Sequence, residues 1–348
     1  MKILLISPVP PPQGGIATWT NNFCLRFENN NEITIINTSR QNKICRNIIS
    51  RALRQLKRNY RIIRKLKSNL VNNYDIAHIN SSCSAIGIFR DYCCSKELKK
   101  HNIPFVFHCH CNIEDQLGKN WLSRHFFSKI VKIASKVYVL NESSRLYCER
   151  IIANKVMKIP NSIDEGFIAE KHTISKKIMT IIFVGHLYKT KGIDSIILTS
   201  KKYPNINFRV IGPYTKDYDN SCNTSNLFFL GKKNKTEIVE ELDKADVFLF
   251  PTHTEGFSIA LLEAMARGIP IITTDVGANK EMLESKGGIV LKIIPNGPID
   301  LSEVLEAKIR SRMSFWSIKR VREHYTHENV FKIIEEDYQT IISSNRNL

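Results

Sequence analysis

The fold is decided by residues 251–282, PTHTEGFSIALLEAMARGIPIITTDVGANKEM. An apolar run, VFLFP (247–251), leads into a loop with glycine and hydroxyl side chains, and an apolar helical pattern covers about 258–267. A second apolar run, IPIITT (269–274), follows directly. A strand, a crossover helix and a second strand make up a βαβ unit, in which the two strands are parallel.

Short apolar runs alternate with helical patterns along the rest of the chain. Besides the two above, the runs that we expect to be strands cover 2–7, 32–37, 74–80, 103–109, 136–141, 178–185, 206–212, 227–231 and 288–292. Helical patterns cover about 47–71, 121–134 and 328–343. This alternation predicts an α/β fold of two tandem doubly wound, Rossmann-like domains, whose parallel sheets face a cleft.

Length and composition set the domain organisation. A chain of 348 residues is too long for one simple core, and 43% hydrophobic and 24% charged residues exclude a disordered or fibrous protein. A polar, lysine-rich stretch interrupts the alternation at about 160–177. We therefore predict a first domain over 1–165, a second over 166–327, and a C-terminal helix over 328–348 that packs back on the first domain.

The sequence also bears on location. No apolar run reaches the roughly 18 residues that a membrane span needs, and the N-terminal run is too short for a signal peptide. The nine cysteines are an odd number. We therefore expect reduced thiols in a cytoplasmic protein.

Positive charge is concentrated in the first half of the chain. Residues 1–165 hold 26 basic and 11 acidic residues, a net charge of +15, whereas residues 166–348 hold 25 and 22, a net charge of +3. This asymmetry indicates an anionic partner for the first domain.

Eleven Lys and Arg lie between residues 40 and 67, without one acid, on a helical pattern. Basic amphipathic helices are typical of proteins that bind anionic lipid. We predict peripheral attachment at the inner face of the cytoplasmic membrane through seven of these residues: Arg51, Arg54, Lys57, Arg58, Arg61, Arg64 and Lys65. We expect the apolar stripe of the helix to be core. The alternative is an ordinary helix with a solvated basic face.

Two glutamates, Glu255 and Glu263, mark the loop and the helix of the opening stretch. Gly256 lets a ligand approach the backbone, and the first N–H groups of a helix suit an anion. Carboxylates accept hydrogen bonds from sugar hydroxyls, often from two at once. Either glutamate alone would fit a solvated surface, but the combination predicts a site for a ligand with hydroxyl and phosphate groups.

This pattern resembles the signature of the retaining glycosyltransferases of family 4, which have the two-domain B-type fold. The family motif E-x(7)-E corresponds to Glu255 and Glu263, and its G-x-P and glycine-to-glutamate (here G-x-x-x-E) elements correspond to 268–270 and 277–281. The resemblance implies that Glu255 contacts the donor sugar and that Glu263 binds the ribose of the nucleotide. It implies that the diphosphate is held at the start of the helix, by Gly256, Phe257 and Ser258.

A second element of the same family follows the strand at 178–185. It contains Gly185, His186 and Lys191, where the family usually has arginine in place of His186. The resemblance implies that His186 and Lys191 neutralise the diphosphate leaving group, and His186 does so only while it is charged. In the first domain, Gly15 follows the first strand and would place its backbone N–H against the diphosphate.

The sequence HCHC (108–111) ends the fourth strand. Strand alternation turns His108 and His110 to one side and the two cysteines to the other, which argues against a metal site. The family has a histidine at this strand end, which implies that His110 lies near the transferred sugar. We expect His108 to be scaffold.

A D-x-D sequence, Asp217-Tyr218-Asp219, looks like the metal motif of a different glycosyltransferase class. It lies in a polar loop, KDYDNSCNTSN, where a solvated surface is the better interpretation. We expect no metal or other cofactor.

Taken as a whole, the sequence predicts a retaining, hexosyltransferase-type enzyme with Glu255, His110 and Lys191 as catalytic residues. It would transfer a sugar from a nucleoside-diphosphate sugar, UDP rather than GDP, to a hydroxyl of a lipid-linked glycan. Such a reaction belongs to bacterial surface polysaccharide assembly (O-antigen, capsule or lipopolysaccharide). A nucleotide-sugar epimerase and a basic nucleic-acid-binding protein are the alternatives, although no nucleic-acid recognition motif is present and we expect no nucleic-acid partner.

Overall fold

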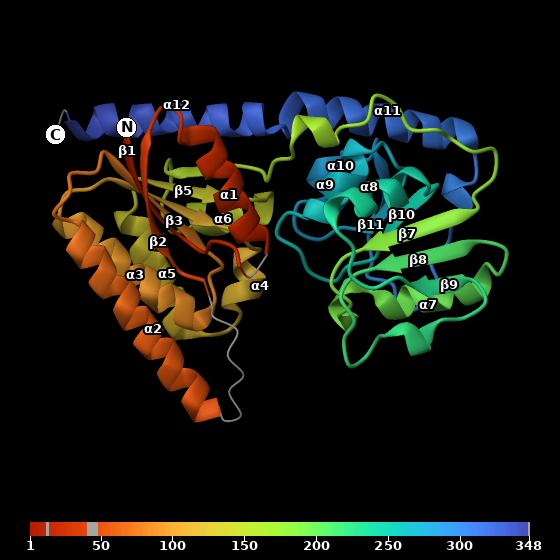
Figure 1. Ribbon diagram of the computed structural model, residues 1–348, viewed down its shortest axis with the longest axis horizontal. Coiled ribbons are helices and arrows are strands. Elements are labelled where there is room, and N and C mark those ends of the chain that lie inside the picture. The colour runs from red at the N-terminus through yellow and green to blue at the C-terminus, as the bar shows by residue number, and fades with distance from the viewer. Residues whose placement is uncertain (12–13, 40–47, 347–348) are drawn as a thin grey trace. The chain divides into compact units, whose positions relative to one another are not determined.

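The computed structural model describes residues 1–11, 14–39 and 48–346, with the side chains of its second helix described from residue 53 on. The chain divides into two compact units (Figure 1). Unit 1 comprises Met1–Asn161 and Val330–Leu348, and unit 2 comprises Ser162–Asn329. The chain thus passes between the units at 161–162 and at 329–330.

Unit 1 is built on a six-stranded parallel sheet of order β2-β1-β3-β4-β5-β6. Its strands are β1 (Lys2–Ser7), β2 (Glu32–Asn37), β3 (Ile76–Ser81), β4 (Phe105–Cys109), β5 (Lys136–Val139) and β6 (Val156–Lys158). The inner strands are buried along their length, because helices cover both faces of a parallel sheet. The parallel sheet predicted for this half of the chain is confirmed.

The helices of unit 1 are α1 (Gly15–Phe27), α2 (Ile48–Asn69), α3 (Ala85–Lys100), α4 (Ile113–Leu117), α5 (Trp121–Ile133), α6 (Glu142–Glu149) and most of α12 (His327–Arg346). Two separate cores follow from the alternation along β1. Leu4 and Ile6 pack in a core with side chains of α2, α3 and α5. Ile3 and Leu5 pack in a core with side chains of α1 and α12.

Helix α12 completes the second of these cores with aromatic side chains. Phe331 lies 6.1 Å, centroid to centroid, from both Phe23 and Phe27 of α1, and Tyr338 is fully buried beside them. Large buried aromatic side chains contribute much of a core's stability. The last helix of the chain is therefore an integral part of unit 1.

Unit 2 is also built on a six-stranded parallel sheet, of order β12-β11-β10-β7-β8-β9. Its strands are β7 (Thr180–Val184), β8 (Asn207–Ile211), β9 (Leu227–Phe229), β10 (Val247–Phe250), β11 (Ile271–Thr274) and β12 (Gly288–Leu291). Its helices are α7 (Ile193–Lys202), α8 (Lys235–Asp243), α9 (Ile259–Ala266), α10 (Asn279–Leu283) and α11 (Ala307–His324). The doubly wound α/β fold predicted from the sequence is confirmed.

The strand order of unit 2 reverses at β7. From β7 the chain proceeds to β8 and β9 on one side and to β10, β11 and β12 on the other. Ligands of open α/β sheets bind at such a reversal, outside the carboxyl ends of the strands. The loops after β7 and β10, which carry most of the predicted site residues, lie at this place.

Helix α11 was not predicted. It packs on α9 through small side chains: a Cβ added at Gly268 would lie 2.9 Å from Ser314 Oγ, and one added at Gly287 would lie 2.7 Å from Ser317 Oγ. Its buried Arg310 donates hydrogen bonds to the carbonyl oxygens of Val304 and Leu305. Because its buried face mixes Arg310, Ser314 and Ser317 with Ile318 and Val321, the apolar period that marks the other helices is weak.

Candidate functional site

The loop after β10 leads into the start of α9, where the sequence predicted a phosphate site. Ser258 is the N-cap of α9, and its Oγ accepts a hydrogen bond of 3.2 Å from the backbone N–H of Leu261. Phe257 is buried and contacts the ring of Tyr325 edge-on at 5.6 Å. The packed Phe257 ring and the Ser258 cap fix the start of the helix, as a preformed anion site requires.

Gly277 holds this loop in place from the next turn of the chain. Its φ is +57°, and a Cβ there would lie 2.4 Å from the carbonyl oxygen of Glu255. Ala278 N–H donates a hydrogen bond of 3.0 Å to the carbonyl oxygen of Gly256. Only glycine combines this φ with such a close approach. Gly277 therefore positions the backbone of Glu255.

Glu255 forms an ion pair with Lys191 from the loop after β7. Lys191 Nζ lies 2.5 Å from Glu255 Oε1 and 3.3 Å from the carbonyl oxygen of Thr254. The pair is largely buried, with side-chain exposures of 20% for Lys191 and 15% for Glu255. Burial raises the pKa of Glu255, while Lys191 and then His186 oppose that shift.

The loop after β7 approaches the end of β10 closely at Gly192. Its φ is +75°, and a Cβ there would lie 2.1 Å from the carbonyl oxygen of Pro251. A side chain at this position would separate the two loops. Gly192 thus brings the neighbouring Lys191 within reach of Glu255.

Glu263 lies on α9, eight residues after Glu255. Burial raises the pKa of its carboxyl group to about 7, and Lys235 opposes the shift. A carboxyl group with this pKa is partly protonated at neutral pH. Bound hydroxyl groups that donate hydrogen bonds would favour its ionised form.

His186 and Gly185 follow β7 directly. The His186 ring is exposed and stacks on that of Tyr188, with centroids 5.7 Å apart and planes 2° from parallel. Gly185 N–H donates to the carbonyl oxygen of Ile211, which continues the pairing of β7 with β8. These two residues therefore border the same loop as Lys191.

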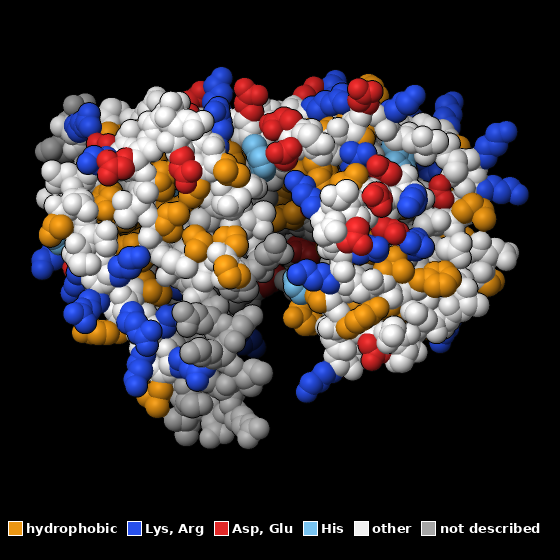
Figure 2. Space-filling model, in the orientation of Figure 1, with side chains coloured by type: hydrophobic (Ala, Val, Ile, Leu, Met, Phe, Trp, Pro, Cys, Tyr) orange, Lys and Arg blue, Asp and Glu red, His pale blue; other side chains and the backbone are white. Residues whose placement is uncertain are grey.

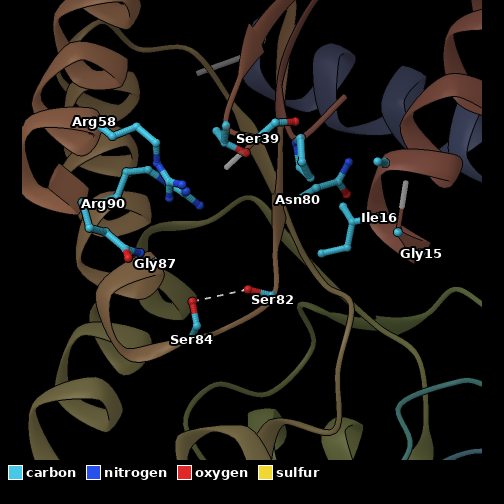
Figure 3. A pocket seen from close by; sticks show the side chains of 14 residues that line it. Gly15, Ile16, Ser39, Arg58, Asn80, Ser82, Ser84, Gly87 and Arg90 are labelled. Carbon is cyan, nitrogen blue, oxygen red and sulfur yellow. Dashed lines mark hydrogen bonds between the residues drawn. The ribbon is translucent and has the colours of Figure 1, made fainter. Parts of the chain in front are cut away.

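In unit 1, Gly15 lies in a pocket of about 390 Å³ at the carboxyl ends of β1, β2 and β3 (Figure 3). Asn80, at the end of β3, lines the same pocket. The oxygen Oδ1 of Asn80 lies 2.6 Å from His110 Nε2 and 3.2 Å from His78 Nε2. Asn80 thus links the pocket that holds Gly15 to the predicted catalytic histidine.

The histidines at the ends of β3 and β4 form a buried network. His78 Nδ1 contacts the hydroxyl group of Tyr338 on α12, and His78 Nε2 lies 3.3 Å from His108 Nδ1. Burial lowers the pKa of His78 and of His110 to about 3, and it lowers that of His108 well below its usual value. All three rings are therefore neutral near pH 7.

The two cysteines of HCHC face away from these histidines. Cys109 packs in the core beneath α2, α3 and α5, together with Cys83 and Cys148, and Cys111 packs against that core. The alternation used to argue against a metal site is thus the one observed. Within residues 1–11, 14–39 and 48–346, no group of three or more His, Cys, Asp or Glu is arranged to hold a metal ion.

The D-x-D sequence lies in a loop between β8 and β9. Asp219 is the N-cap of a short 3-10 turn, Asn220–Cys222, and its Oδ1 accepts a hydrogen bond of 2.9 Å from Ser221 N–H. The hydrogen bonds from the hydroxyl group of Ser221 and then from its backbone N–H lower the pKa of Asp219. A capping role accounts for this aspartate.

The predicted membrane residues share one exposed face of α2, with two exceptions. Arg54, Lys57, Arg61, Arg64 and Lys65 are exposed, and Figure 2 shows Lys and Arg side chains gathered over this helix. Arg58 is half-buried and lines the pocket that holds Gly15. The side chain of Arg51, and residues 40–47, lie outside the described part of the chain.

The apolar stripe of α2 divides into two parts. Ile62, Leu66 and Leu70 are buried in the core, as expected. Leu53, Leu56 and Tyr60 are not: their exposures are 54%, 53% and 67%. The expectation that the whole stripe is core was wrong, because the first half of α2 extends past the sheet it packs on. In the described residues, no helix has both the length and the apolar content that crossing a membrane requires.

Comparison with known sequences decides the family of the second half. Residues 164–310 match the family of glycosyl transferases group 1. The chain carries a group 1 glycosyltransferase domain. This domain contains every predicted site residue of unit 2, including both glutamates and Lys191.

Two proteins illustrate the similarity of this chain to known sequences. An uncharacterized glycosyltransferase of Methanocaldococcus jannaschii is 25% identical over 316 residues, which cover 87% of each chain. A capsular polysaccharide biosynthesis glycosyltransferase of Staphylococcus aureus, CapM, is 28% identical over 200 residues, which cover 52% of this chain and 51% of CapM.

The fold is similar to that of solved structures over the full length of the chain. HepE of Anabaena, solved in complex with UDP, superposes with a TM-score of 0.77 at 14% identity, covering 98% of this chain and 100% of HepE. The expected B-type fold class is confirmed.

Some features of the two units were not predicted from the sequence: contacts of glycines in unit 2, and Asn80 and Arg90, which line the pocket of unit 1. Gly192 determines where Lys191 lies, and its position next to Lys191 could have indicated it. Gly277 was identified as part of a family motif, but its close approach to the backbone of Glu255 was not predicted. Asn80 could have been found as a polar residue at the carboxyl end of a predicted strand. Arg90 carries no signal, since an arginine within a helical pattern is usually solvated.

Proposed function

We propose that this protein transfers a sugar from a nucleoside-diphosphate sugar to an acceptor hydroxyl, with retention at the transferred carbon. The observation that carries the proposal is the buried Lys191–Glu255 pair at the carboxyl end of the unit 2 sheet, beside the start of α9. One positive group, one carboxylate and a row of backbone N–H groups at one place suit a sugar joined to a diphosphate.

Donor binding would give Lys191 and Glu255 new partners. Its diphosphate would attract Lys191 and bind the α9 start at Gly256, Phe257 and Ser258. Glu255 would then accept hydrogen bonds from hydroxyls of the sugar, while Glu263 accepts them from the ribose. As the bond to the sugar breaks, negative charge grows on the diphosphate, and Lys191 stabilises it.

The hydroxyl group that attacks the sugar must lose its proton to a base. In the front-face mechanism that we favour, the departing phosphate oxygen takes it, so the carbon keeps its configuration. His110 is held by Asn80 and would contact the transferred sugar as a neutral hydrogen-bonding group, since burial keeps its pKa at about 3. This mechanism needs no second carboxylate as nucleophile.

We propose UDP rather than GDP as the nucleotide, and no metal. The similar fold of HepE, solved with UDP, supports the first choice. Lys191 and the start of α9 supply positive charge to the diphosphate, which supports the second.

We propose a lipid-linked glycan of a surface polysaccharide as acceptor. The relationship to a capsular polysaccharide biosynthesis glycosyltransferase supports this pathway. The exposed face of α2 supports a membrane location, because basic residues and the exposed Leu53, Leu56 and Tyr60 occur together on it. We therefore place the protein at the cytoplasmic surface of the membrane.

Donor binding tests the proposal. A thermal-shift screen across UDP-, GDP- and ADP-sugars should show stabilisation by UDP-sugars, since a bound donor stabilises the folded state by mass action. Glu263→Ala should weaken UDP binding by about 1–3 kcal/mol, the value of a hydrogen bond to a charged group. Unchanged UDP affinity in this variant would contradict the ribose assignment.

A further inference from the structure

The pocket of unit 1 contains positive side chains that have no role in the proposed donor site. Its described lining residues include two arginines, Arg58 and Arg90, and no acid. Figure 3 shows both side chains extending from α2 and α3 into the pocket, across from Gly15 and Ile16. Hydroxyl groups of Ser39, Ser82 and Ser84 line the same space.

The two arginines are held in different ways. Arg90 is buried, and its Nε and Nη2 donate hydrogen bonds of 2.8 and 2.6 Å to Asp91 Oδ1. The other oxygen of Asp91 accepts a hydrogen bond of 2.6 Å from Ser81 Oγ. Asp91 therefore fixes the Arg90 guanidinium while its remaining N–H groups can bind a ligand. Arg58 is half-buried and adds a second positive charge to the same pocket.

Two helix starts add to this charge. Gly14 and Ser84 are the N-caps of α1 and α3, and neither side chain caps its helix. Ser84 Oγ instead accepts a hydrogen bond of 3.4 Å from Ser82 Oγ. Gly87 in the first turn of α3 allows this arrangement, because a Cβ there would lie 2.7 Å from Ser84 Oγ. Both helix starts keep N–H groups for an anion.

We propose that this pocket binds a phosphate group of the acceptor, held by Arg58, Arg90 and the start of α3, beside the start of α1, whose Gly15 is expected to meet the donor diphosphate. Guanidinium groups match phosphate oxygens in a bidentate manner, and helix starts favour anions. The proposal rests on the proposed function, and it adds that the acceptor is recognised by a phosphate as well as by its sugar.

The position of Arg58 favours the acceptor over the donor as the source of this phosphate. Arg58 lies on α2, whose outer face carries the exposed basic and apolar residues proposed to meet the membrane. In a lipid-linked glycan, the phosphate joins the lipid to the sugar. A helix that touches the membrane with one face and a phosphate with another would position such a molecule.

The test is calorimetric titration of the full chain with inorganic diphosphate, in the presence of saturating UDP so that the donor site is occupied. Arg58→Gln should lower the diphosphate affinity at least about tenfold, as expected for a charge-assisted hydrogen bond. Arg58→Lys should recover part of the affinity. Arg26→Gln, which removes an exposed charge from the last turn of α1, is the control and should leave the affinity unchanged.

A second titration identifies the source of the phosphate. Farnesyl phosphate represents a lipid-linked acceptor, and glucose 1-phosphate represents a soluble one. Both should depend on Arg58, and tighter binding of farnesyl phosphate assigns the site to a lipid-linked molecule. If neither probe nor inorganic diphosphate depends on Arg58 in a folded variant, the proposal is wrong.

UDP affinity separates the two proposals. Arg58→Gln should leave UDP affinity unchanged, whereas Glu263→Ala should lower it. If Arg58→Gln lowers UDP affinity as strongly as diphosphate affinity, the pocket belongs to the donor and the acceptor assignment fails. If Glu263→Ala does not lower UDP affinity while Arg58→Gln still lowers diphosphate affinity, the proposed donor site is wrong and the phosphate pocket stands.

Discussion

The two units have parallel sheets of the same size, but the groups at their strand ends differ in chemistry. In unit 1, the ends of β3 and β4 carry His78, His108 and His110, joined by hydrogen bonds to Asn80 and Tyr338. In unit 2, the loop after β10 and helix α9 carry Glu255 and Glu263. At these strand ends, unit 1 thus buries bases and unit 2 buries acids.

Burial acts on both sets in the same way, because it disfavours the charged form. The histidines lose their protons, and the glutamates tend to keep theirs. The comparison shows that one physical effect gives the two units opposite responses to pH. In the proposed reaction, unit 1 supplies neutral hydrogen-bonding groups, and unit 2 supplies groups whose charge depends on the ligand.

The largest expected effect concerns a property of unit 1 alone, its attachment to membranes. Reversing the five exposed residues of α2 to Glu (Arg54, Lys57, Arg61, Arg64 and Lys65) should release the protein from anionic liposomes. Each basic residue near such a surface is worth about 1 kcal/mol, so the loss is at least about 5 kcal/mol. Co-sedimentation with phosphatidylserine vesicles measures it, and binding of the parent should weaken with salt.

The matched control for this variant is donor affinity. UDP is proposed to bind unit 2, so the reversed variant should bind UDP like the parent. If it still sediments like the parent, α2 has only a solvated basic face.

The second effect compares one residue from each unit. Glu255→Gln and His110→Ala should each lower kcat by about 10²–10³-fold, the usual cost of removing a group that stabilises a transition state. Affinity for free UDP should stay nearly unchanged in both. Near-normal turnover in either folded variant would remove that residue from the catalytic set.

The third effect is the pH dependence of unit 2. The folded pKa of Glu263, about 7, lies above its unfolded value of 4.5, so the folded state binds more protons between these pH values. Stability contributed by this group is therefore present below pH 4.5 and is lost as pH rises to 7, by about 3 kcal/mol. Glu263→Gln should remove this loss, which calorimetric unfolding of parent and variant at pH 5 and 7 measures.

The histidines of unit 1 should respond in the opposite direction. The pKa of His110 is about 3 in the folded state and 6.5 in the unfolded chain, so the unfolded chain binds more protons between these values. Stability should fall as pH decreases from 6.5 toward 3. Acid unfolding of parent and His110→Gln, followed by hydrogen exchange in β4, checks this direction. If the parent and the variant lose equal stability in acid, His110 does not cause that loss.

The smallest expected effect is that of metal removal. Since Lys191 and the α9 start are proposed to stabilise the diphosphate, transfer should proceed unchanged in EDTA. Loss of transfer in EDTA and its rescue by magnesium or manganese would return attention to Asp217 and Asp219.

The sequence was sufficient for the repeating parts of the fold, because buried parallel strands are continuous apolar runs. The strands and α9 lie within a few residues of their expected ranges. Helix α11 was not predicted, since its buried face mixes Ser314 and Ser317 with Ile318 and Val321. Periodicity detects continuous apolar faces, and a buried face interrupted by small polar residues gives only a weak period.

For the site, motif spacing indicated Glu255, Glu263 and Lys191, and the ion pair of Glu255 with Lys191 is now observed. The pocket of Arg58 and Arg90 could not be predicted, because its residues come from three strand ends and three helices. Such a set meets only after the sheet has formed. Sequence places residues along an element, whereas a pocket depends on how the elements pack.

The path of the chain through the two units has a consequence for its synthesis. Unit 2 is one continuous stretch that is synthesised before most of the last helix. Unit 1 begins first, but the core that holds Ile3 and Leu5 of β1 stays incomplete until Phe331 and Tyr338 of α12 have emerged. Domains generally fold as units during translation. The part of the protein that is synthesised first is therefore the part that matures last, and a nascent chain stalled before α12 exposes an apolar sheet face to chaperones.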